Sequence, residues 1–293
     1  MKRVLLQVII KESINDSFYL WYNFFGDVMN LNNFNFKKSL GQNFLIDNNI
    51  LNKIIDASEI ENDSLVIEIG CGSGNLTKKL CEKASYVLGY EIDKSVEEYL
   101  LDNLKGYDNY KIIFGDFLKC NLKEDIKELK YKNIYVVANV PYYITTPILE
   151  KIIDTKIDTN NIVLMVQKEV GDRFSSKPGS KEYGSITVFL NYFYDIKKLF
   201  IVNKNSFLPK PKIDSVVISL KKKEKIKINN EEFFFKLIRD SFKFRRKNIR
   251  NNLKDYDLNK IEEVLKKYGY DLNVRSEELS LEIFGDISNR LSI

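Results

Sequence analysis

Four apolar runs, each followed by a glycine or a polar residue, constrain the fold of this chain more than any other feature. The runs cover residues 65–69, 86–90, 110–114 and 134–138, and the residues that follow them are Gly70, Glu91, Gly115-Asp116 and Asn139. Helical segments separate the runs, and this alternation is typical of a doubly wound α/β fold with a parallel sheet. The C-terminal ends of such strands share one edge of the sheet, where ligands bind. Two further runs, at 161–166 and 213–220, are predicted to complete the sheet.

The first strand leads into a glycine turn, Gly70-Cys-Gly72-Ser-Gly74. Glycine lets the backbone approach a bound nucleotide because it carries no Cβ. Glu91 follows Gly70 by 21 residues, close to the offset of about 20 expected for an acid that binds ribose hydroxyls. The dinucleotide fingerprint has another glycine where this chain has Asn75, so a pyrophosphate is not indicated. A nucleoside-like ligand such as S-adenosylmethionine fits the turn better than NAD.

The tetrapeptide Asn139-Val140-Pro141-Tyr142 suits the binding of a planar heterocycle. The Asn139 amide and the Val140 carbonyl could accept hydrogen bonds from an exocyclic amino group, and Tyr142 offers an aromatic face. An ordinary proline turn is the better interpretation of these four residues alone, but the glycine turn upstream favours a ligand site. For Asp116, a helix N-cap is an alternative to ligand binding, and the two roles are compatible.

The chain contains no histidine, which excludes a histidine base, Ser-His and Cys-His nucleophiles, and histidine metal ligands. Its three cysteines form no Cys-x-x-Cys pair, so neither a zinc site nor a disulfide framework is expected, and we predict no metal. Free cysteines suit a reducing cytosol, and we expect a cytoplasmic protein. No apolar run approaches the roughly 18 residues that span a bilayer, so no membrane association is expected.

Three segments are predicted along the 293 residues. Residues 1–28 fall outside the α/β pattern, and we predict a non-native or disordered extension ahead of a natural start at Met29. Residues 29–220 are predicted to form the ligand-binding α/β domain. Apolar residues recur at helical spacing from residue 229 onward, so residues 221–293 are predicted to form a small helical domain.

Positive charge is concentrated in residues 221–256, which contain nine lysines and four arginines against five acidic residues. The net charge of this stretch is +8, whereas that of the whole chain is +5. Basic residues mixed with aromatic ones predict phosphate binding, with Arg245, Arg246, Lys247 and Arg250 as the candidate contacts to nucleic acid. A solvated helix face is the alternative interpretation.

Several motifs in a shared order make the chain resemble the KsgA-type ribosomal RNA adenine dimethyltransferases over roughly residues 36–285. The matching motifs are Gly41-Gln-Asn-Phe-Leu45, Glu68-Ile-Gly-Cys-Gly-Ser-Gly74, Gly115-Asp116, Asn139-Val-Pro-Tyr-Tyr-Ile-Thr145, Pro209-Lys-Pro-Lys-Ile-Asp-Ser-Val-Val217 and Phe244-Arg-Arg-Lys-Asn-Ile-Arg250. The family usually has Leu or Ile where this chain has Val140, which is a conservative difference. The resemblance implies a Rossmann-like S-adenosylmethionine-dependent methyltransferase domain and a small α-helical C-terminal domain.

The resemblance also implies the cofactor-binding residues. Asn43 and Leu45 would line the cofactor pocket, and Gly70 would lie against the cofactor in the glycine turn. Glu91 would bind the ribose hydroxyls, and Asp116 would accept from the amino group of the cofactor's adenine.

The activity implied by the resemblance is the transfer of two methyl groups to N6 of each of two adjacent adenines near the 3′ end of small-subunit (16S) rRNA. Asn139 would lie between the cofactor and the target base, the Val140 carbonyl would accept from N6, and Tyr142 would stack on the base. The expected partner is the rRNA of a pre-ribosomal 30S particle, which gives the protein a role in ribosome maturation. We expect a monomer.

Three alternatives remain open. A large-subunit rRNA adenine methyltransferase of the macrolide-resistance type shares the cofactor motifs, but the segments 177–184 and 207–215 fit the dimethyltransferases better. A non-catalytic RNA-binding assembly factor on the same fold would not need the intact motif at 139–143. A small-molecule methyltransferase would leave the basic helical segment unexplained.

Overall fold

A computed structural model of the chain describes residues 30–31, 34–35, 42–140 and 144–292. Met29, the extension predicted at 1–28 and Tyr142 lie outside the described residues. The chain divides into two compact units. The sheet unit contains the described residues up to Gly171 together with Lys197–Lys222, and the helical unit contains Asp172–Ile196 and the residues from Lys223 onward.

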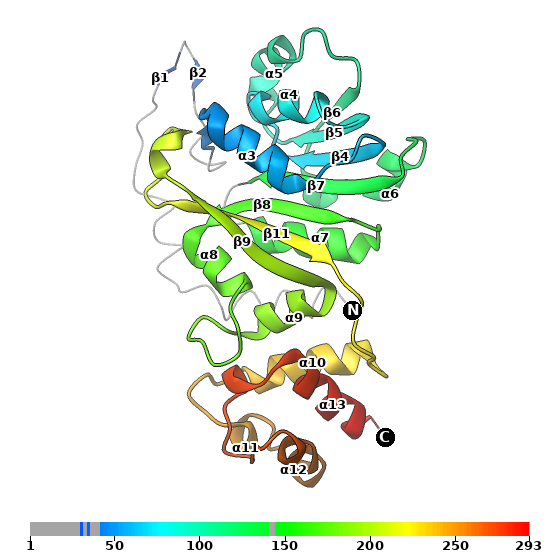
Figure 1. Cartoon of the computed structure of the whole chain (residues 1–293), viewed down its shortest axis with the longest axis vertical. Coiled ribbons are helices and arrows are strands. Elements are labelled where there is room, and N and C mark those ends of the chain that lie inside the picture. Colours follow the sequence, from blue (N-terminus) through cyan, green and yellow to red (C-terminus); the bar gives the residue numbers. More distant parts are fainter. Residues whose placement is uncertain (1–29, 32–33, 36–41, 141–143, 293) are drawn as a thin grey trace. The chain divides into compact units, whose positions relative to one another are not determined.

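A seven-stranded sheet has the strand order β6-β5-β4-β7-β8-β11-β9 (Figure 1). Its strands are β4 (Ser64–Ile69), β5 (Tyr86–Glu91), β6 (Tyr110–Phe114), β7 (Asn133–Asn139), β8 (Asn161–Gln167), β9 (Tyr194–Val202) and β11 (Ser215–Lys222). The five strands from β4 to β8 pair in parallel, as the sequence predicts. The α/β prediction is therefore confirmed for the part of the sheet that carries the strand tips.

The sheet is mixed, because β11 runs antiparallel to β8, a direction that the sequence analysis did not predict. Six successive residues of β11, from Ser215 to Leu220, are buried, so the strand is covered on both faces rather than exposed on one. Strand β9 was not predicted at all. Most of its residues are exposed or half-buried, and its lysine pair Lys197-Lys198 interrupts any apolar run.

Helices cover the sheet, and one hydrophobic core cluster lies between the sheet and three of these helices. In sequence order the helices of the sheet unit are α3 (Asn48–Ser58), α4 (Asn75–Cys81), α5 (Glu97–Asn103), α6 (Leu122–Ile126) and α7 (Thr145–Thr155), with 3₁₀ turns η3 (Lys94–Val96), η4 (Phe117–Lys119) and η6 (Lys204–Ser206). Apolar side chains of α3, α4 and α5 share this cluster with alternate residues of β4, β5, β7 and β8. The C-terminal ends of the parallel strands are thereby held on a rigid support.

Two short ribbons lie outside the main sheet. Strands β1 (Asn30–Leu31) and β2 (Phe34–Asn35) pair with each other, and β3 (Phe44–Leu45) pairs antiparallel with β10 (Phe207–Leu208). Beside the second ribbon, Ile46 N–H donates to the Ser206 carbonyl at 3.0 Å and the Ser206 hydroxyl donates to Asp47 at 3.1 Å. The segment at 42–47 is thus fastened to a part of the chain far away in sequence.

The helical unit has its own core. Its helices are α9 (Ser185–Phe193), α10 (Glu231–Ser241), α11 (Ile249–Asn252), α12 (Leu258–Lys267) and α13 (Leu281–Leu291), with the 3₁₀ turn η7 (Ser276–Glu278), while α8 (Lys168–Phe174) begins in the sheet unit. Phe234, Leu237, Ile261 and Phe284 are fully buried in its core cluster. The prediction of a helical C-terminal part is confirmed. Across the described ranges, no helix combines the length and apolarity that crossing a membrane requires.

Candidate functional site

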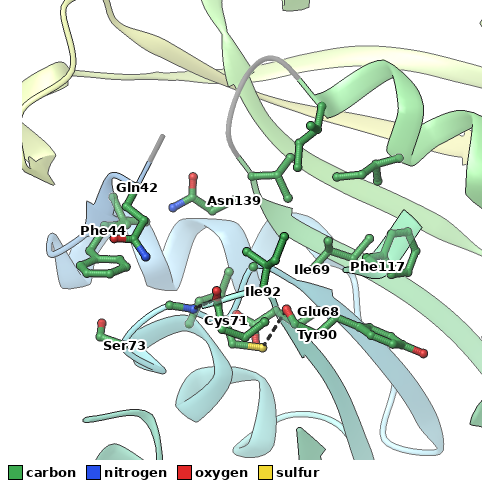
Figure 2. Close-up of a pocket in the computed structure, with 18 of the residues that line it drawn as sticks. Gln42, Phe44, Glu68, Ile69, Cys71, Ser73, Tyr90, Ile92, Phe117 and Asn139 are labelled. Carbon is green, nitrogen blue, oxygen red and sulfur yellow. Dashed lines mark hydrogen bonds between the residues drawn. The ribbon is translucent and has the colours of Figure 1, made fainter. Parts of the chain in front are cut away.

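A cavity of about 290 Å³ lies where β4, β5, β6 and β7 end. It is lined by seven of the residues singled out from the sequence, namely Asn43, Leu45, Gly70, Glu91, Asp116, Asn139 and Val140. Gln42, Phe44, Glu68, Ile92 and Phe117 lie around the same space (Figure 2). A volume near 300 Å³ is at the lower end of the range of small-molecule sites. The four strand tips therefore converge on one hollow of ligand size.

The glycine turn forms one wall of this cavity. Gly70, Gly72 and Gly74 have φ values of 82°, 55° and 85°, a backbone region that glycine enters without steric cost. A Cβ at Gly70 would lie 3.2 Å from the Asn139 carbonyl oxygen, and one at Gly72 would lie 3.0 Å from the Phe44 ring. Both the conformation and the close neighbours therefore require glycine, and the turn presents bare backbone to the cavity.

The Glu91 carboxylate is fixed by two backbone donors. Its Oε2 accepts from Gly72 N–H and its Oε1 accepts from Asp93 N–H, both at 2.8 Å. Burial raises the pKa of Glu91 above its ordinary value, and these two N–H groups oppose the shift. Each carboxylate oxygen can accept a further hydrogen bond. Glu91 therefore offers a hydrogen-bond acceptor in a fixed orientation at the tip of β5.

The segment Gln42–Leu45 reaches the cavity through side-chain contacts as well as through β3. Gln42 Nε2 donates to Asp93 Oδ2 at 2.6 Å, and Asn75 Nδ2 donates to the Leu45 carbonyl at 3.2 Å. Asn139 Nδ2 donates to the Asn43 carbonyl at 3.4 Å, and Figure 2 shows the Asn139 amide beside Gln42 and Phe44. Because the amide nitrogen is directed at Asn43, the Asn139 oxygen is left as an acceptor.

Asp116 has the N-cap role that the sequence left open. Its Oδ1 accepts from Leu118 N–H at 3.0 Å at the start of η4, and Lys119 Nζ lies 3.6 Å from Oδ2. The carboxylate also lines the cavity, so the structure is compatible with both roles for this residue.

Glu68 is the cavity residue that the sequence reasoning missed. Its side chain is fully buried, and neither carboxyl oxygen has a hydrogen-bond partner among the described residues. Burial raises the pKa of Glu68 to about 8; the Thr77 and Cys71 side chains oppose the shift, and the nearby Glu91 adds to it. The available signal was an acidic residue inside an otherwise apolar strand, since a charge there is rarely buried without a reason.

The predicted nucleic-acid contacts lie in the helical unit and do not line the cavity. Arg245, Arg246, Lys247 and Arg250 are all exposed. Within the described ranges none of the four takes part in a salt bridge. A metal site is not indicated in the described part of the chain either. No group of three or more histidine, cysteine or acidic side chains lies close enough together there to hold a metal ion.

Comparisons with known proteins agree on one family. The model of the family described as "Ribosomal RNA adenine dimethylase" matches residues 33–292. A protein of Bacillus cytotoxicus named Ribosomal RNA small subunit methyltransferase A is 43% identical over 275 residues, covering 90% of this chain and 94% of that protein. A protein of the same name from Bacillus mycoides is 42% identical over 277 residues, with the same coverage.

Two solved structures share the fold. The crystal structure of a dimethyladenosine transferase from Plasmodium falciparum superposes with a TM-score of 0.72 at 29% identity, covering 83% of this chain and 95% of that one. The structure of the 23S rRNA methyltransferase ErmE superposes with a TM-score of 0.70 at 23% identity, covering 85% of this chain and all of that one. The likeness to ErmE concerns the fold alone.

Proposed function

The chain belongs to the ribosomal RNA adenine dimethylase family, and on that premise we propose that it methylates N6 of two adjacent adenines near the 3′ end of small-subunit rRNA. It is an rRNA adenine dimethyltransferase. S-adenosylmethionine is the proposed methyl donor, and the rRNA of a pre-ribosomal 30S particle is the proposed substrate. The proposed compartment is the cytoplasm, and the proposed state of the enzyme is a monomer.

The cavity residues fit the proposed cofactor. The bare backbone of the glycine turn leaves room that a Cβ would fill, and the held carboxylate of Glu91 suits a pair of ribose hydroxyls. Asp116 and the apolar side chains of Ile92 and Phe117 provide a site for a purine. When bound, S-adenosylmethionine supplies a methyl group on a sulfonium, which is already electrophilic.

The difficult partner in this reaction is the nucleophile, because the N6 lone pair of adenine is delocalised into the ring. The Asn139 amide oxygen and the Val140 carbonyl would accept hydrogen bonds from N6–H. These bonds favour a more tetrahedral nitrogen and stabilise the positive charge that develops on it. Holding the amine in line for transfer can supply up to about 7–11 kcal/mol. None of these steps needs a histidine base, and the chain has none.

Removal of the target base from its stack costs a few kcal/mol, less where the RNA is single-stranded. Stacking on Tyr142, a role that stays a prediction, would return about 1–3 kcal/mol. The exposed basic residues of the helical unit would supply affinity for phosphates that does not depend on sequence.

A single observation supports this mechanism most directly: the Asn139 amide is oriented by the Asn43 carbonyl at the cavity, at the tip of a buried strand. We predict that Asn139→Ala lowers methyl transfer at least 100-fold while the dissociation constant for RNA stays within about threefold, because one electrostatic group at the reacting atom is worth about 3–4 kcal/mol. Near-normal turnover by the variant would remove Asn139 from the mechanism.

The activity itself is tested with labelled S-adenosylmethionine and 30S or 50S particles from an unmethylated strain, followed by primer extension to locate the modified bases. Label in two adjacent adenines of 30S rRNA is the expected result. Label confined to 50S rRNA would contradict the proposal and favour the large-subunit alternative. A catalytically inert protein that still binds 30S particles would favour the assembly-factor alternative.

A further inference from the structure

Phe244 is the most exposed aromatic side chain among the described residues, at 55% of its full accessibility. It lies in the loop between α10 and α11, in the sequence Lys243-Phe-Arg-Arg-Lys247, which we call the basic loop. A single exposed apolar side chain is ordinary in a folded protein. Two further features of the loop make this ring unusual.

The first feature is that the backbone around the ring is held in place. The Asn252 side chain accepts from Phe244 N–H at 3.1 Å and donates to the Phe244 carbonyl at 3.3 Å. The same amide lies 3.4 Å from the Lys247 carbonyl, and Lys247 N–H donates to the Phe244 carbonyl at 2.9 Å. One amide on α11 therefore fixes both polar backbone groups of Phe244, and the ring is presented to solvent from an ordered turn.

The second feature is the charge around the ring. The other four residues of the basic loop are exposed cations, and Lys243 Nζ lies 5.7 Å from the centre of the Phe244 ring. Arg245 donates to the Lys181 carbonyl at 2.5 Å, which ties a third exposed lysine to the two in the loop. In the described part of the chain, no acidic side chain neutralises the four loop cations through a salt bridge.

An apolar ring beside several cations that no described salt bridge neutralises fits one kind of partner best. A purely apolar protein surface would have to desolvate those cations without compensation. Single-stranded RNA offers both a flat π-face for the ring and phosphates for the cations, and stacking platforms beside basic residues are typical of such sites. A paired duplex offers the phosphates but keeps its bases inside the stack.

We propose that Phe244 is a stacking platform for an unpaired base of the rRNA, other than the adenine received at Asn139, while the cations of the basic loop bind the flanking phosphates. The proposal rests on the proposed function, because it assumes that the helical unit contacts rRNA. The ligand class is a nucleotide in a loop, bulge or single strand. The fixed backbone means that little conformational entropy is lost when the base stacks.

The test compares the full-length protein with the variants Phe244→Leu and Phe244→Trp. Binding is measured by fluorescence anisotropy with two labelled RNAs of equal length, a fully paired duplex and a hairpin with an unpaired loop, at several salt concentrations. Tyr131→Leu serves as the matched control, since Tyr131 is an exposed aromatic residue of the sheet unit. Circular dichroism and thermal melting check that each variant is folded.

We expect Phe244→Leu to weaken hairpin binding about 5- to 150-fold, the range that corresponds to one base stack, and to leave duplex binding unchanged. The slope of log K against log salt should stay the same, because no phosphate contact is removed. Phe244→Trp should restore hairpin binding, and Tyr131→Leu should bind like the wild type. Wild-type affinity in Phe244→Leu, or an equal loss on both RNAs, would overturn the stacking role alone. Failure of the wild type to bind either RNA would also overturn the stacking role, whereas the proposed function fails only if 30S particles are not labelled in the assay described above.

Discussion

Replacing Glu68 with glutamine is expected to stabilise the protein strongly at alkaline pH and only slightly near pH 5. The Glu68 carboxyl is fully buried without a hydrogen-bond partner among the described residues, and burial raises its pKa from an ordinary 4.5 to about 8. Below about pH 4.5 both the folded and the unfolded chain hold this proton. Between pH 4.5 and 8 the unfolded chain releases it while the folded chain keeps it, so the contribution of Glu68 to stability falls as the pH rises. Above pH 8 the loss is complete.

The size of the loss follows from the two pKa values. One pKa unit corresponds to about 1.4 kcal/mol, so a rise from 4.5 to about 8 amounts to about 5 kcal/mol of unfolding free energy at pH 8 and above. Glutamine has nearly the same shape and cannot ionise, so it avoids this loss. The variant should therefore be more stable than the wild type by roughly 3–5 kcal/mol at pH 8.5 and by less than about 1 kcal/mol at pH 5.

Urea denaturation of both proteins at half-unit intervals from pH 5 to 9 measures this difference without any cofactor. Titrations of other groups cancel in the comparison because both proteins share them. Glu98→Gln is the matched control, since Glu98 is exposed on α5 of the same unit. A difference between the Glu68 proteins that does not change with pH, or an equal effect in the control, would refute the reasoning.

Further predictions concern the glycine turn and the basic surface. Gly74→Ala should lower the unfolding free energy by about 2–4 kcal/mol, and Gly106→Ala should lower it by about 1 kcal/mol. Both glycines have a positive φ, but only at Gly74 would a Cβ clash, because it would lie 2.8 Å from a buried leucine of α5. Equal losses of the two variants in urea denaturation would contradict this prediction. Changing Arg245, Arg246 and Arg250 together to glutamine should weaken RNA binding and reduce the slope of log K against log salt by about 2, while calorimetry shows unchanged affinity for S-adenosylmethionine. An unaltered salt slope would show that these residues are only solvated surface.

The strand tips were predictable because the physics behind them is local. Four of the five parallel strands, all except the edge strand β6, are buried on both faces, so they read as continuous apolar runs, and parallel pairing puts the ends of all five at one edge. This is why the sequence alone predicts that Gly70, Glu91, Asp116 and Asn139 lie around one cavity. The placement of these residues follows from the lengths of the apolar runs and from their alternation with helical segments.

What could not be predicted depends on contacts between distant parts of the chain. The composition of β11 does not predict its direction, because a strand buried on both faces is apolar whether it runs parallel or antiparallel to its neighbour. The two-residue pair β3–β10 is too short to give a periodic signal. The burial of Glu68 without a hydrogen-bond partner among the described residues is also a tertiary property, because its strand neighbours predict only a buried position.

The β3–β10 ribbon has a consequence for how the enzyme is made. Ser206 and Asp47, which bond beside this ribbon, are 159 residues apart in sequence, so β3 lacks its strand partner until β10 has left the ribosomal exit tunnel. The closing of so long a loop costs entropy that only the finished sheet can offset. A nascent chain released before β10 would therefore carry every strand tip of the cavity and still lack the strand that pairs with β3. The β3–β10 ribbon is therefore one of the last parts of the sheet unit to be completed during synthesis.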